Sequence, residues 1–432
     1  MNIVKLTPGT GNFHCGSCLR DHAFVKALKR QGHDVLIVPM YLPHVTDGDD
    51  EDHPIFFGGI NVFLQHKIPF FRKTPRWIDR LFDRRGLLNM AAAKAGMTKP
   101  RELGELTLSM LHGENGKQLK ELDRLITWLQ ELEKKPDVVV LSNCLLIGMA
   151  RRIREKLGVP VVCTLQGEDT FLDDLPEPYR EHCWTELRAR ALDVSAFIAV
   201  SEYYASVMRP RIGQEIQVVH NGLDFSEVTL RDEDWPTTPR IGFLARMCHV
   251  KGLGHLVDAF ITMFEAEKAR GHDCREVELC IVGACTPADE AFVAEQKEKL
   301  RQADLLDQVQ FHPNVTAEEK FDFLRSFSLL CVPAMYGESF GLYVIEAMAV
   351  GTPVIQPNHA AFPEIVDLTG GGAVVEFETL AETLAKHIHD PLQLKAWGEA
   401  GRKGVETHFA IDTVARRYAD ILGGLDDIPS GT

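Results

Sequence analysis

The chain alternates short apolar runs with longer amphipathic stretches over most of its length. Several of the apolar runs contain no polar position, as is typical of strands buried on both faces of a parallel sheet. Amphipathic segments such as HAFVKALKRQG, residues 22–32, lie between them and predict helices. The alternation therefore predicts an α/β fold with doubly wound parallel sheets. The predicted strands are NIVKL, DVLIVPM, INVFL, DVVVL, PVVCTL, AFIAV, IQVVH, RIGFLA, VELCIVG, VQFH, LLCVP, PVIQ and GAVVE.

The length of 432 residues exceeds what one hydrophobic core usually supports and favours two domains. The segment SEVTLRDEDWPTTP is polar, acidic and contains prolines, and the strand and helix alternation restarts after it. We therefore expect an N-terminal domain at 1–225, a linker at 226–239 and a C-terminal domain at 240–408. We expect a last helix within 409–425 to pack back on the N-terminal domain, which carries a mainly helical insertion at about 66–135.

Composition and charge narrow the class of protein. A formal net charge of -15 argues against general nucleic-acid binding, which needs a cationic surface. No apolar run is long enough to span a membrane and no signal-peptide core follows MNIVKL, so we expect a cytoplasmic protein. The ten cysteines lie mostly in apolar runs, where free cysteine behaves as a small hydrophobe, and this usage fits a reducing compartment.

The insertion begins with a basic and aromatic segment. Residues 67–85 hold seven Lys or Arg and two Asp, interleaved with Phe70, Phe71, Trp77 and Phe82. Such a segment is able to lie on an anionic membrane surface, which suggests peripheral contact with the inner face of a membrane. The more common alternative is a helix whose aromatic side chains pack on its own domain while its charges face water.

The most informative motif is YGESFGLYVIEAMAVGTPVIQP, residues 336–357. A predicted strand, a glycine-flanked turn and a helix follow one another here. The backbone amides of Phe340, Gly341 and Leu342 then lie at the start of a helix without intrahelical partners. This geometry favours a bound phosphate, which the helix dipole attracts.

Two cations upstream complete the predicted anion site. In IGFLARMCHVKG, Arg246 and Lys251 follow the carboxyl end of a predicted strand, where open parallel sheets bind ligands. A bidentate guanidinium and a point-charge ammonium together suit a diphosphate. Glu338 and Glu346 would be ~12 Å apart along a continuous helix, too far for a pair of carboxylates acting on one glycosidic bond. We therefore expect separate roles for them.

These motifs resemble one known family. The Glu-x7-Glu pattern in ESFGLYVIE, followed by AMAVGTPVI and PEIV, is similar to the retaining glycosyltransferases of family four, the sucrose-synthase and glycogen-synthase-like group. VSEYY from Ser201, VVHNGLD and ALKRQGHDVLIV are further similarities, and the likeness covers nearly the whole chain outside the insertion. It implies the GT-B architecture, in which two Rossmann-like domains face each other across a cleft.

The resemblance also implies a reaction. Such enzymes transfer a hexose from a nucleotide-diphosphate sugar, UDP- or GDP-linked, to an acceptor hydroxyl with retention of configuration. They usually use neither a metal nor a further cofactor. The acceptor, which the sequence leaves open between a glycan, a lipid-linked sugar and a small molecule, would bind mainly to the first domain.

Residue roles carry over position by position. Arg246, Lys251 and the amides around Gly341 would hold the donor diphosphate, Glu338 the donor sugar and Glu346 the ribose. The base would lie near two residues of the FHPNV motif, in which proline stands where the family usually has glycine. These two residues are Asn314 and Val315.

One position departs from the family pattern. In TLQGED, Gln166 stands where the family often has a histidine beside the donor sugar. A neutral amide forms hydrogen bonds with sugar hydroxyls but carries no proton. Either the site tolerates the change or Asp169 shares the role.

Residues 7–18, in the stretch TPGTGNFHCGSCLRD, are expected to lie between the first strand and the first helix. Gly9, Gly11 and Gly16 would allow the backbone to approach the substrate closely, as in the family's glycine-rich loop. Cys15 and Cys18 also permit a redox or metal role, although a zinc site needs four ligands and a second pair is missing. We interpret them as cleft-lining residues, and the acidic run DGDDED at 47–52 as solvated.

Two other functions remain open at this point. A nucleotide-sugar 2-epimerase shares the GT-B architecture and the donor site. A catalytically silent binding subunit would also bind the donor, although the complete set of glutamates and cations argues against it.

Overall fold

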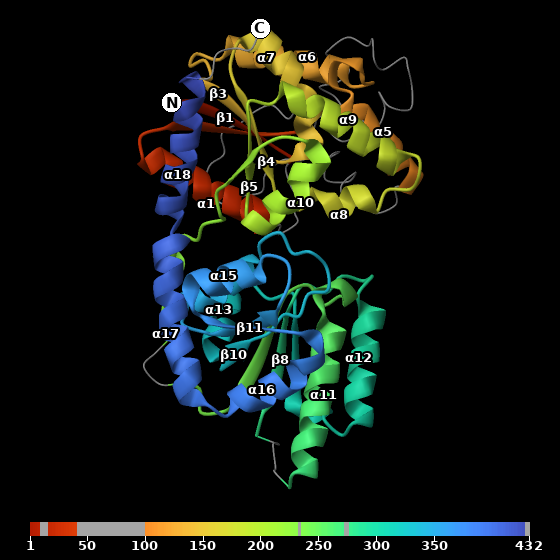
Figure 1. Cartoon of the computed structure of the whole chain (residues 1–432), viewed down its shortest axis with the longest axis vertical. Helices are drawn as coiled ribbons and strands as arrows, with labels where there is room; N and C mark the ends of the chain where they lie inside the picture. The colour runs from red at the N-terminus through yellow and green to blue at the C-terminus, as the bar shows by residue number, and fades with distance from the viewer. Residues whose placement is uncertain (9–15, 41–99, 232–234, 272–275, 428–432) are drawn as a thin grey trace. The chain divides into compact units, whose positions relative to one another are not determined.

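The computed structural model describes residues 1–8, 16–40, 100–231, 235–271 and 276–427 (Figure 1). The chain divides into two compact units. The first comprises Met1–His220 with Ala415–Thr432, and the second is Asn221–Val414.

A sheet of six parallel strands forms the centre of the first unit, in the order β2-β1-β3-β4-β5-β6. Its apolar strands follow the sequence pattern closely, and β3 and β4 are buried at every position. The strands are β1 (Asn2–Thr7), β2 (Asp34–Pro39), β3 (Val138–Leu141), β4 (Val161–Leu165), β5 (Ala196–Ala199) and β6 (Ile216–Val218). The helices are α1 (Gly16–Arg30), α5 (Pro100–Leu111), α6 (Leu119–Glu131), α7 (Ala150–Leu157), α8 (Glu168–Asp173), α9 (Tyr179–Arg190), α10 (Glu202–Ile212) and α18 (Ile411–Gly423).

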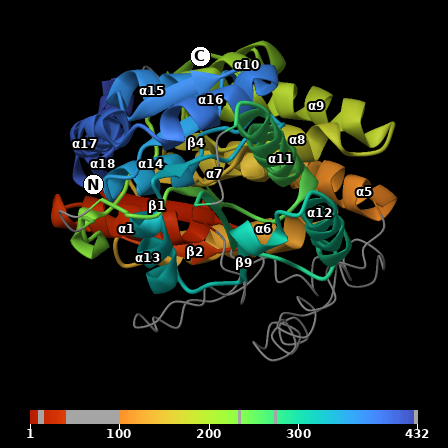
Figure 2. The same ribbon diagram turned by 90° about the horizontal axis from the view of Figure 1, so that it is seen from below.

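The second unit repeats this plan with six parallel strands in the order β12-β11-β10-β7-β8-β9. Its strands are β7 (Arg240–Leu244), β8 (Glu278–Gly283), β9 (Val309–Pro313), β10 (Leu329–Leu330), β11 (Val354–Pro357) and β12 (Gly372–Val375). Its helices are α11 (Leu253–Ala269), α12 (Glu290–Gln302), α13 (Ala317–Ser326), α14 (Leu342–Ala349), α15 (Phe362–Thr369), α16 (Leu380–Ile388) and α17 (Pro391–His408). Helices lie on both sides of the sheet, and α11 and α12 lie side by side (Figures 1 and 2). The predicted doubly wound α/β fold is confirmed.

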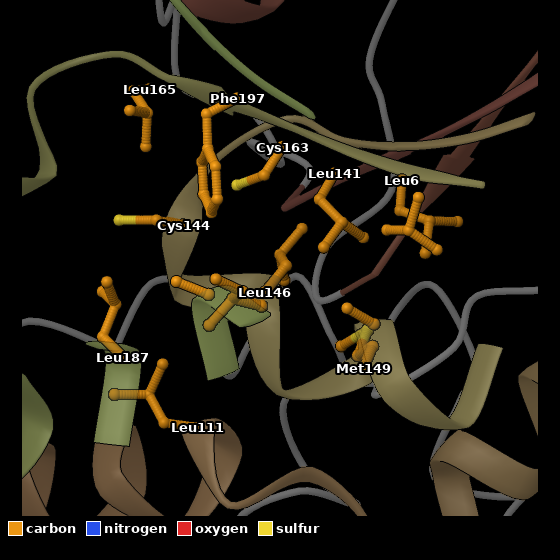
Figure 3. Close-up of a cluster of buried hydrophobic side chains, with 14 of the residues drawn as sticks. Leu6, Leu111, Leu141, Cys144, Leu146, Met149, Cys163, Leu165, Leu187 and Phe197 are labelled. Carbon is orange, nitrogen blue, oxygen red and sulfur yellow. The ribbon is translucent and has the colours of Figure 1, made fainter. Parts of the chain in front are cut away.

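The core of the first unit shows why the strands lack polar positions. Side chains from the sheet and from the helices that cover it point toward one another (Figure 3). Cys144 and Cys163 are fully buried among leucines, and burial raises the pKa of both thiols. They therefore act as small apolar side chains, as the sequence predicts.

The boundary between the two units lies close to the predicted linker, and two other predicted segments lie outside the described residues. The contact division of the chain falls after His220, before the predicted linker at 226–239. The described part of that linker packs on the second unit, because Arg231 donates to the Phe327 carbonyl and, over 2.6 Å, to Thr352 Oγ1. The predicted strand at 60–64 and the basic segment at 67–85 lie outside the described residues. The described part of the insertion contains α5 and α6.

The last helix, α18, crosses from the second unit to the first. The ring of Tyr418 packs edge-on against Phe24 with 4.9 Å between centroids, and its hydroxyl lies 3.4 Å from Thr164 Oγ1. The first unit is therefore completed by residues from the other end of the chain.

Leu187→Ala tests the core shown in Figure 3. Leu187 is fully buried on α9, so we expect the unfolding free energy to fall by about 2–5 kcal/mol through lost burial and a residual cavity. Leu192→Ala is the matched control, because Leu192 is 72% exposed and its loss is expected to change stability by less than about 0.5 kcal/mol. Urea unfolding followed by circular dichroism measures both. Equal effects of the two substitutions would contradict the assigned core.

Candidate functional site

The strand order of the second unit brings two distant loops together. The chain builds β7, β8 and β9 in one direction and then places β10 on the other side of β7. Loops at the carboxyl ends of strands flanking such a reversal form the usual ligand site of open parallel sheets. Arg246 and Lys251 follow β7, and Glu338 and Gly341 follow β10.

Glu338 is the centre of this site. Its Oε2 atom lies 2.6 Å from Lys251 Nζ, 3.0 Å from the Tyr336 hydroxyl and 3.2 Å from the Tyr343 hydroxyl. Lys251 Nζ also donates to the Tyr336 hydroxyl. The side chains of Lys251 and Glu338 are 20% and 12% exposed, so the ion pair is largely shielded from water. Three donors thus fix one carboxylate oxygen in place.

Tyr336 and Tyr343 stabilise the ammonium charge of Lys251 and also hold the carboxylate of Glu338 in place. Lys251 Nζ lies 4.8 Å from the ring centroid of Tyr336 and 5.7 Å from that of Tyr343, within the range of cation–π attraction. Burial raises the pKa of the Tyr343 phenol, and the neighbouring Glu338 carboxylate raises it further. Tyr343 therefore stays protonated and donates to Glu338. Within the described part of the chain, these hydrogen bonds to Tyr336 and Glu338 use two of the three ammonium protons of Lys251.

Arg246 is held by the neighbouring loop after β8. Its Nε atom lies 2.9 Å from Asp289 Oδ2, and Nη2 lies 3.3 Å from Thr286 Oγ1. The Arg246 side chain is 50% exposed whereas that of Asp289 is 5% exposed. Asp289 therefore anchors the guanidinium, while half of the Arg246 side chain stays exposed and accessible to an anionic ligand.

The pKa values of this pair follow from its geometry. The hydrogen bond to Asp289 raises the pKa of the Arg246 guanidinium. Burial acts to raise the pKa of Asp289, but the hydrogen bonds from Arg246 and Thr286 outweigh it and hold that pKa below its ordinary value. Both side chains are therefore charged around neutral pH.

The predicted helix start is distant from these cations in the sequence, but it follows β10, which pairs with β7 in the sheet. α14 begins at Leu342, and Gly341 precedes it with a φ of +86°, a left-handed conformation that favours glycine. The first amides of α14 have no partner within the helix. Phe340 is 2% exposed and packs edge-on against Phe409. This contact holds the turn that precedes α14 against the core of the second unit.

Glu346 has a separate environment on the second turn of α14. Its Oε1 atom lies 2.8 Å from Lys320 Nζ on α13, and the two side chains are 17% and 25% exposed. A capping box between Thr316 and Glu319 fixes the start of α13. Glu338 and Glu346 therefore have different partners, consistent with separate roles.

Asn314 and Val315 follow β9, as their sequence positions predict. Asn314 has a φ of +59°, and its side-chain amide forms hydrogen bonds of 3.0 and 3.2 Å with the backbone N and O of Cys285. The side chain of Asn314 thus joins the loops after β8 and β9. Val315 is half-buried beside it.

Some of the predicted residues of the first unit lie within the described residues and others lie outside them. Gln166 lies in the turn between β4 and α8, Asp169 is the second residue of α8, and Gly16 is the first residue of α1. Gly9 and Gly11 lie outside the described residues, as do Cys15 and the acidic run at 47–52.

Sequence reasoning missed several partners of the predicted residues. Tyr336 and Tyr343 flank Glu338 in the motif itself, so their spacing was a visible signal. Asp289 and Thr286 follow the next strand along the sheet, and only the sheet order shows that they reach Arg246. The link between Lys320 and Glu346 had no sequence signal beyond opposite charge.

A cavity of about 550 Å³ lies elsewhere in the first unit, along α9. Asp173 accepts hydrogen bonds there from Trp184 over 2.9 Å and from Arg211 over 2.8 Å, so these polar groups satisfy one another. None of the predicted site residues lines this cavity.

Within the described residues, no cluster of three or more His, Cys, Asp or Glu side chains is arranged to hold a metal ion. The helices of the same part of the chain include none with the length and apolar character needed to cross a bilayer.

Two family models match adjacent parts of the chain. The model described as Glycosyltransferase Family 4 matches residues 99–227, and the model described as Glycosyl transferases group 1 matches residues 229–404. The second range contains Arg246, Lys251 and Glu338, and the first contains Gln166 and Asp169.

Individual proteins are similar over parts of the chain. The lipopolysaccharide core biosynthesis mannosyltransferase LpsB of Rhizobium meliloti is 29% identical over 200 residues, 44% of this chain and 53% of the relative. The MMP alpha-(1->4)-mannosyltransferase of Mycolicibacterium hassiacum is 26% identical over 299 residues, 65% of this chain and 68% of the relative. The chain thus aligns with about half of the first relative's length. A sucrose-phosphate synthase structure from Thermosynechococcus elongatus has a TM-score of 0.67 at 16% identity and covers 98% of this chain and 99% of its own, a likeness of fold.

Asp289→Asn tests the anchoring of Arg246. The lowered pKa of Asp289 means that its ionised form stabilises the folded state at pH values above the ordinary carboxyl pKa, and this contribution disappears as the pH falls through the lowered value. We expect the variant to unfold at a lower temperature than wild type at neutral pH, with a difference that shrinks between about pH 5 and pH 2. Thermal unfolding across this range measures it.

The control for this experiment is Asp258→Asn, which removes a more exposed carboxylate paired with Lys299 on the surface. We expect it to change the unfolding temperature little at any pH. A difference between wild type and Asp289→Asn that is constant over the range would contradict the ion pair.

Proposed function

We propose that this chain, a GT-B glycosyltransferase of the group 1 and family 4 type, transfers a hexose from a nucleotide-diphosphate sugar to an acceptor hydroxyl with retention of configuration and without a metal. The observation that carries the proposal is the convergence of Lys251, Tyr336 and Tyr343 on one oxygen of Glu338. This cluster lies at the strand-order reversal where sheets of this kind bind ligands.

The donor diphosphate would be held by cations and amides together. Arg246 and Lys251 follow β7, and α14 follows the neighbouring strand β10. The exposed part of the Arg246 guanidinium, the third ammonium proton of Lys251 and the first amides of α14 would contact the diphosphate. A diphosphate gains charge as it leaves the sugar, so these fixed donors stabilise the transition state more than the ground state. The protein cations take the part that a metal plays in other transferases.

The remaining donor contacts follow from the two glutamates and the loop after β9. Because Oε2 of Glu338 is engaged by three donors, its Oε1 atom is the one left to accept from a sugar hydroxyl. Glu346, held by Lys320, would accept from the ribose hydroxyls. Asn314 and Val315 would lie near the base.

Retention fits a front-face reaction. In that scheme the leaving phosphate takes the proton of the acceptor hydroxyl, and the acceptor attacks the face from which the phosphate departs. No nucleophilic side chain is then required. Gln166 and Asp169 would contact the sugar by hydrogen bonding, and the segment with Gly9 and Gly11, together with Gly16 at the start of α1, would approach both substrates.

The relatives suggest which substrates to test first. Both are named as mannosyltransferases, so GDP-mannose and UDP-hexoses are the first donors, with glycan and lipid-linked acceptors. We propose a cytoplasmic enzyme with peripheral membrane contact through residues 67–85. Neither family model describes an epimerase, and the 2-epimerase alternative is not favoured.

Glu338→Gln and Lys251→Ala test the proposed site. Each substitution removes one partner of the shielded ion pair between Lys251 and Glu338. The transition state then loses one fixed charge, and the remaining partner is no longer held in place. We expect transfer rates to fall by about 100-fold or more while the circular dichroism spectrum is unchanged. Glu298→Gln is the control, because Glu298 is an exposed carboxylate on α12. Wild-type rates in both site variants, measured with a donor that wild type uses, would remove the site.

Chelation and product stereochemistry test the mechanism. With excess EDTA we expect the transfer rate to stay within about 2-fold of the untreated enzyme, because the proposed phosphate contacts are protein groups. Proton NMR of the initial product is expected to show the anomeric configuration of the donor. Loss of activity that added metal restores, or an inverted product, would contradict the respective part of the proposal.

A further inference from the structure

The turn after β4 is built around a buried carboxylate that the sequence motifs did not single out. Glu168 is the first residue of α8 and is only 7% exposed, and its side chain folds back over the turn. Its Oε2 atom accepts from the amides of Gln166 over 2.8 Å and Gly167 over 3.0 Å. Gly167 has a φ of +121°, so the turn itself requires glycine.

The same carboxylate also binds the loops after the two neighbouring strands. Oε2 accepts from the Tyr204 hydroxyl of α10 over 3.0 Å, and Oε1 accepts from the amide of Cys144, after β3, over 3.3 Å. Tyr204 is fully buried, and its own amide is bonded to Ser201 at the start of α10. One side chain thus joins the carboxyl ends of β3, β4 and β5.

The carboxylate of Glu168 can be buried only because hydrogen bonds offset the cost of removing it from water. A buried carboxylate is costly unless it is paired or hydrogen-bonded. Among the residues that the structure describes, no Lys, Arg or His side chain forms an ion pair with Glu168, so its four donors are what offset the cost. Burial raises the pKa of Glu168, and the hydrogen bonds from the turn oppose that rise. An apolar residue would hold a simple packing position more easily.

The network ends at a side chain with an open acceptor. The Tyr204 hydroxyl also accepts from the amide of Asp169 over 3.3 Å. The Asp169 Oδ1 atom is buried and has no hydrogen-bond partner among the described residues. A buried acceptor without a partner is destabilising, and a ligand hydroxyl is a donor that would satisfy it.

We propose that Glu168 is the positioning residue of the turn that presents Gln166 and Asp169 to the transferred sugar, and that Tyr204 acts through it. The inference rests on the proposed function, because it assigns the sugar as the group that this turn meets. A displacement of about 1 Å in such a contact is enough to cost ~100-fold in rate. The expected signature is therefore a lower kcat with donor binding intact.

Two substitutions test the proposal. Tyr204→Phe removes one hydroxyl, and with it a donor to Glu168 and an acceptor for Asp169. Glu168→Gln keeps the size of the side chain but turns one oxygen into an NH₂ group, which would face amide or hydroxyl donors that it cannot accept from. Ser206→Ala is the matched control, because it removes an exposed hydroxyl from the same helix as Tyr204.

The measurements separate positioning from stability. With the donor and acceptor that wild type uses, we expect kcat to fall about 10-fold in Tyr204→Phe and about 100-fold in Glu168→Gln. We expect KM for the donor, and the dissociation constant for UDP or GDP measured by calorimetry, to stay within about 2-fold. Hydrogen exchange read by mass spectrometry on a peptide spanning residues 165–172 is expected to accelerate about 10-fold in both variants and not in Ser206→Ala.

The outcomes are distinguishable. Wild-type kcat in Tyr204→Phe and Glu168→Gln, or a loss shared equally by Ser206→Ala, overturns the positioning role. If Glu168→Gln does not fold, Tyr204→Phe alone decides, because it leaves the carboxylate in place. If wild type transfers no sugar from any donor, the proposed function fails, while unchanged exchange of the 165–172 peptide in the variants would refute the turn network on its own.

Discussion

The placement of β10 beside β7 is the constraint on which the candidate site depends. A parallel sheet brings all its carboxyl ends to one edge, and the reversal of strand order leaves β7 between β8 and β10. Lys251 after β7 can then pair with Glu338, 87 residues further along the chain, and Arg246 can pair with Asp289 after β8. Neither cation alone makes an anion site, because an isolated surface charge is screened by water and salt.

In each unit a carboxylate holds loops at the carboxyl edge of the sheet, but the groups that donate to it differ. Glu338 is held by an ammonium group and two phenols, so its environment carries a compensating positive charge. Glu168 is held by three backbone amides and one phenol, and no cationic side chain within the described ranges pairs with it. The first arrangement suits a site that binds a charged leaving group, and the second suits a rigid turn that presents neutral contacts.

The sequence predicted the parallel sheets because buried strands need continuous apolar runs, and twelve of the thirteen expected runs appear as strands, the other lying outside the described residues. It also placed Arg246, Lys251 and Glu338 on loops at carboxyl ends. It could not identify Asp289, Lys320 or the role of Tyr204, because hydrogen-bond partners far apart in the chain leave no periodic pattern. The linker at 226–239 was predicted from its polar composition, and composition gives no information on the hydrogen bond from Arg231 to the Phe327 carbonyl.

The discontinuous first unit has a consequence for biosynthesis. Phe24 and Thr164 are translated before the second unit, but Tyr418, which contacts both, is translated after it. Domains usually fold in the order in which they leave the ribosome, yet here the second unit is complete in sequence before the first. The apolar face of the first unit that Tyr418 covers therefore stays exposed until the second unit has been translated, and it is a natural binding surface for chaperones.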